Sequence, residues 1–279
     1  MTAPKKISDR RLSLAALLVV TACGGADRPA DESGIRQWNL PDRLREISGL
    51  ALTGDERLLA VDDEIGFIYE LDYENGGIVK TFAFGDPVIP GDFEGIAVLE
   101  DRVWLMTSDG DLLVAAEGGD GEAVDFDHFE TGIGEDCELE GLAELHDAGA
   151  LLLMCKDGRD RKKLRMYEWH PVDGLVEETK LPEKDMEDAI DKKRVSPSGV
   201  AIRPGSDERF VVTGIQHAVF AISPDGELND VIMRLDKGRH RQAEGIALTR
   251  DGRMLIADEG GKGRARLAIY RLDDGNNKN

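Results

Sequence analysis

The sequence predicts an all-β fold, a β-propeller of five four-stranded blades, and two patterns support this prediction. A motif of Glu or Ser, Gly, an aliphatic residue and Ala occurs five times, with its glycines at 49, 95, 141, 199 and 245. The steps between these glycines are 46, 46, 58 and 46 residues, and self-similarity at roughly 40–50 residues marks a repeat architecture. Each full repeat also holds four short extended runs separated by turn residues, which is the content of one propeller blade.

The runs of each repeat follow in a fixed order. The motif forms the first strand, and the second is an unbroken apolar run, as expected for a strand covered on both faces. The second runs lie at 58–61, 103–106, 151–154, 210–212 and 254–257. The third lie at 67–71, 112–116, 164–169, 218–222 and 267–272, and the fourth at 78–82, 124–129, 175–181 and 231–235. Small residues in the motif let five inner strands crowd round one axis, while its aliphatic position packs against a neighbouring blade.

The fifth repeat lacks a fourth run, because the chain ends soon after residue 272. Residues 35–40 form an unassigned extended run before the first motif, and they can complete the last blade and close the ring without an exposed edge. The step of 58 residues exceeds the others by 12, too few for a further blade. Five blades are therefore favoured, with six as the alternative. We expect one domain over residues 35–275 and a disordered tail over 276–279.

The first residues lie outside the repeats. Basic residues at 5, 6, 10 and 11 precede a short apolar stretch at 12–20, which is typical of an export signal and predicts one over residues 1–22. This stretch is too short to span a bilayer. Val-Thr-Ala-Cys at 20–23 resembles the lipobox of bacterial lipoproteins. The resemblance implies cleavage before Cys23, lipidation of its thiol, and attachment to the membrane through that anchor alone.

Residues 23–34, rich in Gly, Asp and Ala, then form a flexible tether. The anchor implies a location in the cell envelope, facing the periplasm. Gly24 rather than Asp follows the cysteine, and lipoprotein sorting patterns then favour the outer membrane over the inner.

The chain is strongly acidic. It carries 35 basic and 56 acidic residues, a formal net charge of −21. Such acidity opposes binding to nucleic acid and favours solubility and divalent cations. We expect a monomer that binds no nucleic acid.

Two cysteines remain in the repeats. Cys137 lies just before the third motif strand and Cys155 at the end of the next run. A hairpin turning near residues 147–149 would bring them side by side, which predicts a disulfide in an exported chain. A pair of buried free thiols is the alternative.

In a propeller, the connection into the innermost strand and the turn after the second strand emerge on one face. We therefore expect an acidic mouth around the axis, whose candidate metal ligands are Glu94, Glu140, Glu244, Asp62 and Asp258. Their carboxylates should repel one another unless a hard cation neutralises them, so Ca²⁺, which takes about six to eight oxygen ligands, is the expected cofactor. Alternatively, each glutamate binds backbone amides of the next blade and only staples the ring.

Charged side chains surround this mouth. The candidate ligand-binding residues of the rim are Asp63, Asp109, Lys156, Asp157, Arg159, His217, Arg241, Glu259 and Lys262. An acidic centre with basic tips suits a metal-bridged phosphate or carboxylate, although such a rim is also typical of a salt-bridged surface. The five histidines show no metal-ligand spacing and no Gly-x-Ser-x-Gly elbow occurs, so no catalytic residue is predicted. His217 and His240 are the histidines that can reach this face.

Four motif segments resemble the SdiA-regulated family of bacterial β-propellers: 92–96, 139–143, 196–200 and 242–247. The resemblance covers about residues 35–272. Members of that family are usually exported or membrane-attached, and they are similar in architecture to phytase-like and NHL-type propellers. This chain departs from the family at 62–64 and 258–259, which are purely acidic where an acidic-plus-basic pair is common.

We therefore expect an exported, lipid-anchored propeller that binds a small-molecule or protein ligand or acts as a scaffold, rather than an enzyme. Two alternatives remain open. The phytase-like resemblance and the acidic mouth together imply a Ca²⁺-dependent hydrolase of phosphate esters. A purely structural envelope protein would instead use the outer surfaces of the blades.

Overall fold

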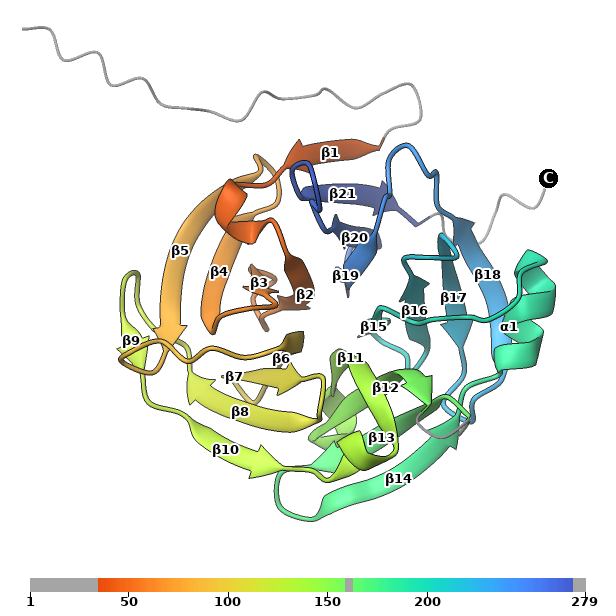
Figure 1. Cartoon of the computed structure of the whole chain (residues 1–279), viewed down its shortest axis with the longest axis horizontal. Helices are drawn as coiled ribbons and strands as arrows, with labels where there is room; N and C mark the ends of the chain where they lie inside the picture. The colour runs from red at the N-terminus through yellow and green to blue at the C-terminus, as the bar shows by residue number, and fades with distance from the viewer. Residues whose placement is uncertain (1–34, 159–162, 273–279) are drawn as a thin grey trace, which may run out of the picture.

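A computed structural model describes residues 35–158 and 163–272, and it shows five sheets arranged around one central axis (Figure 1). The predicted five-bladed propeller is therefore confirmed, and the six-bladed alternative is wrong. The predicted export signal, tether, lipidated Cys23, rim residue Arg159 and tail 276–279 lie outside the described residues.

Each blade is numbered by its inner strand in chain order, and its strands run outward from the axis. Blade 1 contains β2 (Ile47–Leu52), β3 (Leu58–Asp62), β4 (Phe67–Asp72) and β5 (Gly77–Phe84). Blade 2 contains β6 (Phe93–Leu99), β7 (Arg102–Thr107), β8 (Asp111–Ala116) and β10 (Asp127–Glu130). Blade 3 contains β11 (Cys137–Leu145), β12 (Ala150–Gly158), β13 (Arg165–His170) and β14 (Gly174–Lys180). Blade 4 contains β15 (Gly199–Ile202), β16 (Arg209–Thr213), β17 (Ala218–Ile222) and β18 (Leu228–Arg234).

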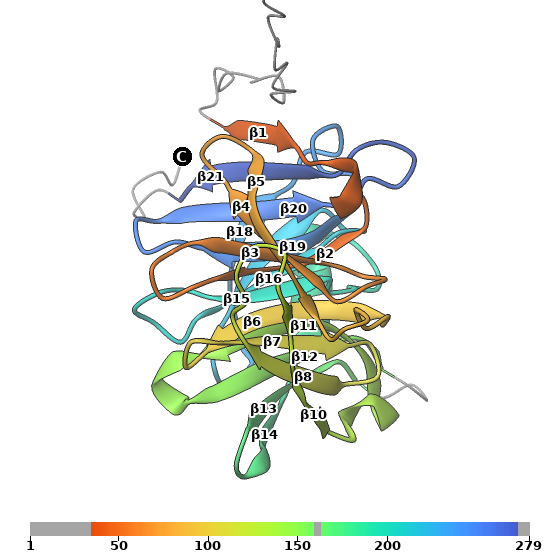
Figure 2. The same ribbon diagram turned by 90° about the vertical axis from the view of Figure 1, so that its left-hand side faces the viewer.

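Blade 5 unites the two ends of the described chain. It contains β19 (Ala243–Leu248), β20 (Arg253–Asp258), β21 (Arg266–Arg271) and β1 (Arg36–Asn39). Strand β1 pairs antiparallel with β21, with Trp38 opposite Leu267, and Figure 2 shows the two strands side by side at one end of the molecule. Trp38 is 9% exposed, and its indole nitrogen donates to the carbonyl of Tyr73 in blade 1 at 3.0 Å. The predicted closure of the ring by residues 35–40 is confirmed.

The motif glycines bring the inner strands together. A Cβ atom at Gly95 would lie 2.6 Å from Leu142 Cβ, and one at Gly245 would lie 2.8 Å from Leu50 Cγ. Gly49 and Gly141 stand in the same relation to Ile96 and Val200, the aliphatic motif residues of the blades that follow them. Each of these glycines thus receives an aliphatic side chain of its neighbour, and a larger residue would push the blades apart.

One outer segment differs from the prediction. Residues 124–129 are not a single strand: β9 (Ala123–Val124) pairs in parallel with β5 of blade 1, and β10 is the fourth strand of blade 2. The chain between them is held by Phe126, whose ring stacks on Phe84 of blade 1 at 5.9 Å between centroids. Aromatic packing against the neighbouring blade therefore divides the run.

Short helical segments connect some of the strands. They are η1 (Asp42–Leu44), η2 (Ile133–Glu135), η3 (His146–Ala148) and α1 (Glu183–Ile190). Helix α1 lies in the longer connection between blades 3 and 4, where it buries Met186 and Ile190. None of the helices within the described ranges is long and apolar enough to cross a membrane.

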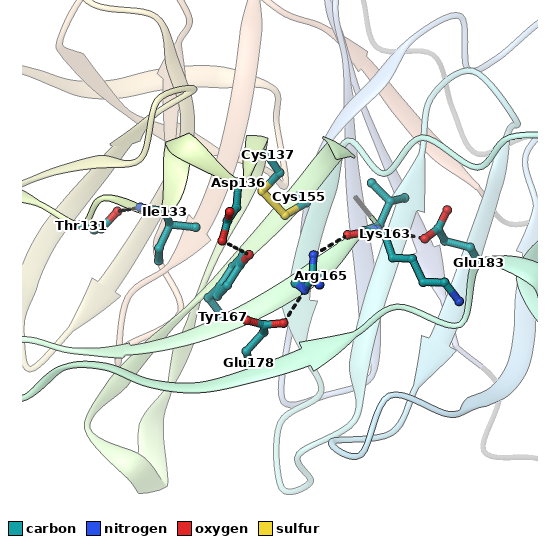
Figure 3. The surroundings of a disulfide bond; sticks show 11 residues. Thr131, Ile133, Asp136, Cys137, Cys155, Lys163, Arg165, Tyr167, Glu178 and Glu183 are labelled. Carbon is teal, nitrogen blue, oxygen red and sulfur yellow. Dashed lines mark hydrogen bonds and ion pairs between the residues drawn. A yellow bond between two sulfur atoms is a disulfide. The ribbon is translucent and has the colours of Figure 1, made fainter. Parts of the chain in front are cut away.

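The predicted disulfide is present. Cys137 and Cys155 are bonded across β11 and β12, with their Cα atoms 5.7 Å apart (Figure 3). Just before β11, Asp136 accepts a hydrogen bond of 3.4 Å from the hydroxyl of Tyr167 on β13. The disulfide and this hydrogen bond fix the end of the β11–β12 hairpin that contains Cys137 and Cys155.

Candidate functional site

The first residue of each motif lies at an interruption of strand pairing. In β2, β6, β11 and β19 the register with the second strand shifts at Ser48, Glu94, Glu140 and Glu244. The corresponding residue of blade 4, Ser198, directly precedes β15. A bulge takes a side chain out of the regular alternation of a strand and aims it elsewhere. This bulge recurs in four blades and therefore gives their first motif residues equivalent positions.

The structure brings together three glutamates from three blades. Burial raises the pKa of Glu94 to about 8, and the charge of Glu140 is the next cause. Burial also raises the pKa of Glu140 to about 8, with the charge of Glu244 next. For Glu244, burial raises the pKa to about 7, and the charge of Glu94 adds to the rise. The charge of each carboxylate therefore raises the pKa of another one of the three, as expected of groups that share one axial site.

An ammonium group lies among these carboxylates. Lys156 of β12 donates a hydrogen bond to Glu140 Oε1, and its Nζ lies 3.7 Å from Glu138 Oε1. Burial alone would lower the pKa of Lys156, but the bond to Glu140 and the charges of Glu138 and Glu94 raise it overall. The sequence pattern places Lys156 on a basic rim, whereas the structure places it at the acidic centre.

A second set of equivalent positions extends this centre. In each blade, the motif glycine pairs with a residue of the second strand, and the new position lies two residues after that partner. Its residues in the five blades are Asp63, Ser108, Lys156, Gly214 and Glu259. Burial, followed by the charges of Asp62 and Glu46, raises the pKa of Asp63 to about 7. The pKa of Glu259 is also raised, because burial and the charge of Glu46 outweigh the lowering effect of the Lys156 ammonium. These five residues and the five first motif residues are called the axial mouth below.

Two serines of the axial mouth join neighbouring blades. Ser198 donates to the carbonyl of Ala243 at 2.6 Å and accepts from the amide of Gly214 at 3.0 Å. Ser48 donates instead to Glu94 Oε2 at 3.1 Å. Ser198 thus joins two blades through hydrogen bonds to backbone groups. Glu94 and Glu140 instead form hydrogen bonds with the side chains of Ser48 and Lys156.

The five candidate calcium ligands do not form one set. Glu94, Glu140 and Glu244 surround Lys156, while Asp258 Oδ2 accepts a hydrogen bond of 2.7 Å from His240 Nδ1. Asp62 Oδ1 accepts from the amide of Glu64 at 3.2 Å. Across residues 35–158 and 163–272, no group of three or more His, Cys, Asp or Glu side chains is arranged to hold a metal ion. Ca²⁺ stays a prediction, and it would have to compete with Lys156 for Glu140.

The remaining rim residues are more scattered. The exposed ones are Asp109, Asp157, Arg241 and Lys262. Asp157 lies 3.8 Å from Arg194. His217 is partly buried in the turn between β16 and β17. His240, expected to reach this face, is instead fully buried. Of the rim, Asp63, Lys156 and Glu259 therefore belong to the axial mouth.

No family model matches the chain. No curated protein matches it either. Solved structures do match, among them a glutaminyl cyclase from Myxococcus xanthus with a TM-score of 0.54 and 15% identity, over 84% of this chain and 94% of that one. A luciferin-regenerating enzyme matches with a TM-score of 0.54 and 10% identity, over 82% of this chain and 92% of that one.

The PQQ-bound form of an aldose sugar dehydrogenase from Streptomyces coelicolor has a TM-score of 0.52 and 14% identity, over 86% of this chain and 99% of that one. At such low identity these similarities show the fold alone. The resemblance to the SdiA-regulated family stays a prediction.

Proposed function

We propose that this propeller is a binding module whose axial mouth takes a cationic group of its ligand. The observation that carries the proposal is the convergence of Glu94, Glu140 and Glu244 around the ammonium of Lys156. Lys156 offsets one negative charge, so the mouth carries an excess of negative charge when all three glutamates are ionised. A bound cation relieves that excess and replaces the water that burial has removed.

An organic ammonium fits this mouth better than Ca²⁺. Lys156 shows how the carboxylates accept N–H donors, because its Nζ already donates to Glu140 and lies near Glu138. An ammonium needs separate acceptors rather than a complete shell of oxygen ligands. The net charge of −21 would also draw cationic ligands toward the protein.

Calorimetric titration with propylammonium chloride and with CaCl₂, at matched ionic strength and neutral pH, tests this proposal. We expect propylammonium to bind and to raise the melting temperature of the protein. The double variant Glu94→Gln with Glu244→Gln should lose most of this binding, because it removes two carboxyl groups that can ionise and pair with the cation. Glu177→Gln with Glu227→Gln, which changes two exposed glutamates, is the matched control and should bind as the parent does.

The outcomes separate the possibilities. If neither cation binds, or if both double variants bind like the parent, the axial mouth is not a cation site. If only Ca²⁺ binds, and the mouth variant abolishes that binding, the mouth is a metal site and the ammonium assignment is wrong.

One observation favours a second candidate function, acid–base catalysis. Burial and neighbouring charge bring the pKa values of Glu94 and Glu140 to about 8 and that of Glu244 to about 7. Groups that titrate near neutral pH are suited to proton transfer. Hydrolysis of phosphate esters, with and without chelator, tests this candidate. Activity that chelator abolishes and Glu140→Gln lacks would support a Ca²⁺-dependent hydrolase.

The proposed setting is the cell envelope, with a lipid anchor on Cys23. The export pattern of residues 1–22 supports this setting. The Cys137–Cys155 bond supports it as well, because disulfides persist mainly in oxidising compartments. Membrane fractionation of a Cys23→Ala variant is the test. Detergent-requiring association that survives the substitution would contradict the anchor.

A further inference from the structure

A groove of about 610 Å³ lies between the outer strands of blades 2 and 3, away from the innermost strands that carry the axial mouth. Phe129 of β10 and Trp169 of β13 form its aromatic wall, with their ring centroids 5.4 Å apart. The exposed side chains that line it include Glu130, Val172 and Asp173. This space, called the outer groove below, therefore combines apolar and acidic surface.

Exposed apolar side chains gather beside the outer groove. Within the described ranges five large hydrophobic side chains are exposed, and three of them lie on the β13–β14 hairpin. They are Val172, Leu175 and Val176, with exposed fractions of 83%, 51% and 60%. Leu175 pairs with Trp169, so its side chain lies on the same face of blade 3 as the aromatic wall. Scattered apolar residues are ordinary on a surface, but a group beside a groove marks an interaction site.

The outer edges of the other blades are short or covered. Strands β1 and β10 have four residues each. Strand β5 receives β9, and helix α1 packs against β18, where Arg234 donates to the carbonyls of Ala189 and Ile190 at 2.9 and 3.0 Å (Figure 1). Strand β14 has seven residues, and no strand in the described part of the chain pairs with its outer edge. Its backbone groups can therefore pair with an added strand.

The protein already uses strand addition on blade 1. Ala123 and Val124 of β9 pair in parallel with Ala83 and Phe84 of β5. Phe126, two residues further along the chain, stacks on Phe84 with 5.9 Å between ring centroids. The added segment thus combines backbone pairing with an aromatic anchor. Blade 3 offers both parts of such a site, a free edge on β14 and an aromatic groove beside it.

The charges around the outer groove define the partner. Glu130 and Asp173 line the groove, and Glu177 and Glu178 lie on β14. A second copy of this chain, with its β14 antiparallel to the first, would bring these acids close to one another, and like charges across a strand pair are destabilising. Basic side chains would instead form ion pairs there. The net charge of −21 also favours the approach of a basic partner.

We propose that the outer groove and the edge of β14 form a docking site for an extended segment of a partner protein that carries apolar and basic side chains. The segment pairs with β14 as a further strand. Its apolar side chains lie against Leu175 and the aromatic wall, and its basic side chains pair with Glu130 and Asp173. This site is independent of the ligand proposed for the axial mouth.

A synthetic peptide, acetylated and amidated at its ends, tests this site. It carries two lysines at each end and a core of valine, phenylalanine, valine and threonine. Fluorescence anisotropy at neutral pH and physiological ionic strength should show saturable binding. Replacement of the lysines by glutamates, or of the core by serines, should weaken binding by at least about tenfold. The absence of saturable binding of the lysine peptide would overturn the docking site.

N-methylation of the peptide tests strand addition itself. Amides of alternate residues in a strand point to opposite edges, so methylation of the first and third core amides blocks one edge, and methylation of the second and fourth blocks the other. A peptide that pairs with β14 uses one edge. The two methylated peptides should therefore differ in affinity, and equal affinities would contradict pairing with β14.

Val176→Lys is the first protein variant, with Val79→Lys as its matched control. Each valine is the extra residue of a bulge in the outer strand of its blade, and the two are 60% and 58% exposed. Val176→Lys should weaken peptide binding by at least about tenfold, because it replaces an apolar contact by a repelling charge. Val79→Lys should bind the peptide as the parent protein does. Both variants should keep the melting temperature of the parent, because more than half of each side chain is solvated.

Glu130→Lys with Asp173→Lys is the second variant and should also lose peptide binding. Asp225→Lys with Glu227→Lys changes the net charge equally at exposed positions of blade 4 and should retain it. Glu94→Gln with Glu244→Gln should retain it as well, because the axial mouth lies elsewhere. If both lysine pairs bind the peptide equally, or if only the mouth variant loses it, the docking site is wrong. Neither result bears on propylammonium binding, which tests the proposed function separately.

Discussion

Lys156 of β12 and Glu140 of β11 form an ion pair in which the carboxylate is 2% exposed and the amine 35% exposed. The pair lies on the hairpin that the Cys137–Cys155 disulfide ties, since Cys155 directly precedes Lys156. Blade 3 thus supplies both a buried acid and the ammonium that partly neutralises the acids of blades 2 and 5. This hairpin therefore supplies the one ammonium group among the residues that define the axial mouth.

Lys156→Met should destabilise the protein, because it leaves Glu140 buried without its cation. We expect the free energy of unfolding to fall by about 1–3 kcal/mol, below the usual cost of breaking a fully buried pair because the amine is partly solvated. Urea unfolding at pH above the raised pKa of Glu140 measures this change. Lys184→Met, which removes an exposed pair with Asp188, is the control and should change stability by less than about 0.5 kcal/mol. Equal effects in the two variants would contradict the central position of Lys156.

Stability should fall as pH rises across the neutral range. The pKa values of Glu94 and Glu140 rise from an ordinary 4.5 to about 8 in the folded protein. The folded state then binds more protons at these two groups than the unfolded state, so their contribution to stability is complete below pH 4.5 and is lost as pH rises to about 8. Each such group contributes at most about 1.4 kcal/mol per pH unit. Urea midpoints over this window should decline, and Glu94→Gln should flatten the decline; a rise would contradict the burial of these groups.

Removal of the disulfide should cost about 3 kcal/mol in the chain-entropy model, because it spans 18 residues. The double variant Cys137→Ala with Cys155→Ala should show this loss in urea unfolding. The parent protein, reduced while unfolded and then refolded under reducing conditions, should match it. An unchanged urea midpoint in both samples would show that the disulfide does not reduce the conformational entropy of the unfolded chain.

Trp38→Ala should open the seam of the ring. The substitution removes a buried indole of β1 and its bond to Tyr73 in blade 1, and large-to-small changes of this kind cost about 3–5 kcal/mol. Thermal unfolding and light scattering should show lower stability and aggregation through the exposed edge of β21. Val172→Ala, at a site 83% exposed, is the control and should stay within about 0.5 kcal/mol of the parent. Equal stability of the two variants would mean that β1 does not close the ring.

Gly199→Ala should disturb the contact between blades 4 and 5. A Cβ atom there would lie 2.2 Å from the carbonyl oxygen of Glu244, so the inner strands would have to separate. We expect a loss of at least about 2 kcal/mol, in the range of overpacked cores. Gly54→Ala has nothing within 4 Å of the added atom and should be nearly neutral. Similar unfolding curves for the two variants would contradict the close approach at Gly199.

The ring could be predicted from sequence because one steric requirement recurs in every blade. Gly95 must admit Leu142, and Gly245 must admit Leu50, so glycine and an aliphatic residue return at a nearly constant interval. The strand at β9 could not be predicted in this way. Its pairing depends on the packing of Phe126 against Phe84 of another blade. The repeated motif contains no residue pattern that would predict this contact.

The axial mouth was partly predictable for the same reason. Glu94, Glu140 and Glu244 occupy the same motif position, so their convergence follows from the repeat. The central place of Lys156 was also open to detection, because it aligns with Asp63 and Glu259 once the strands are in register. The burial of His240 was not, since no sequence pattern links it to Asp258 and Tyr270.

Blade 5 takes its outer strand from the beginning of the described chain and its other three strands from the end. A ribosome releases the chain from the N-terminus, so Trp38 emerges long before Leu267, its partner across the seam. During that interval β1 has no sheet to join, and four blades can form before the circle closes. The last step of folding therefore waits until β21 has been synthesised, and a chain cut short before β21 would carry its first strand unpaired.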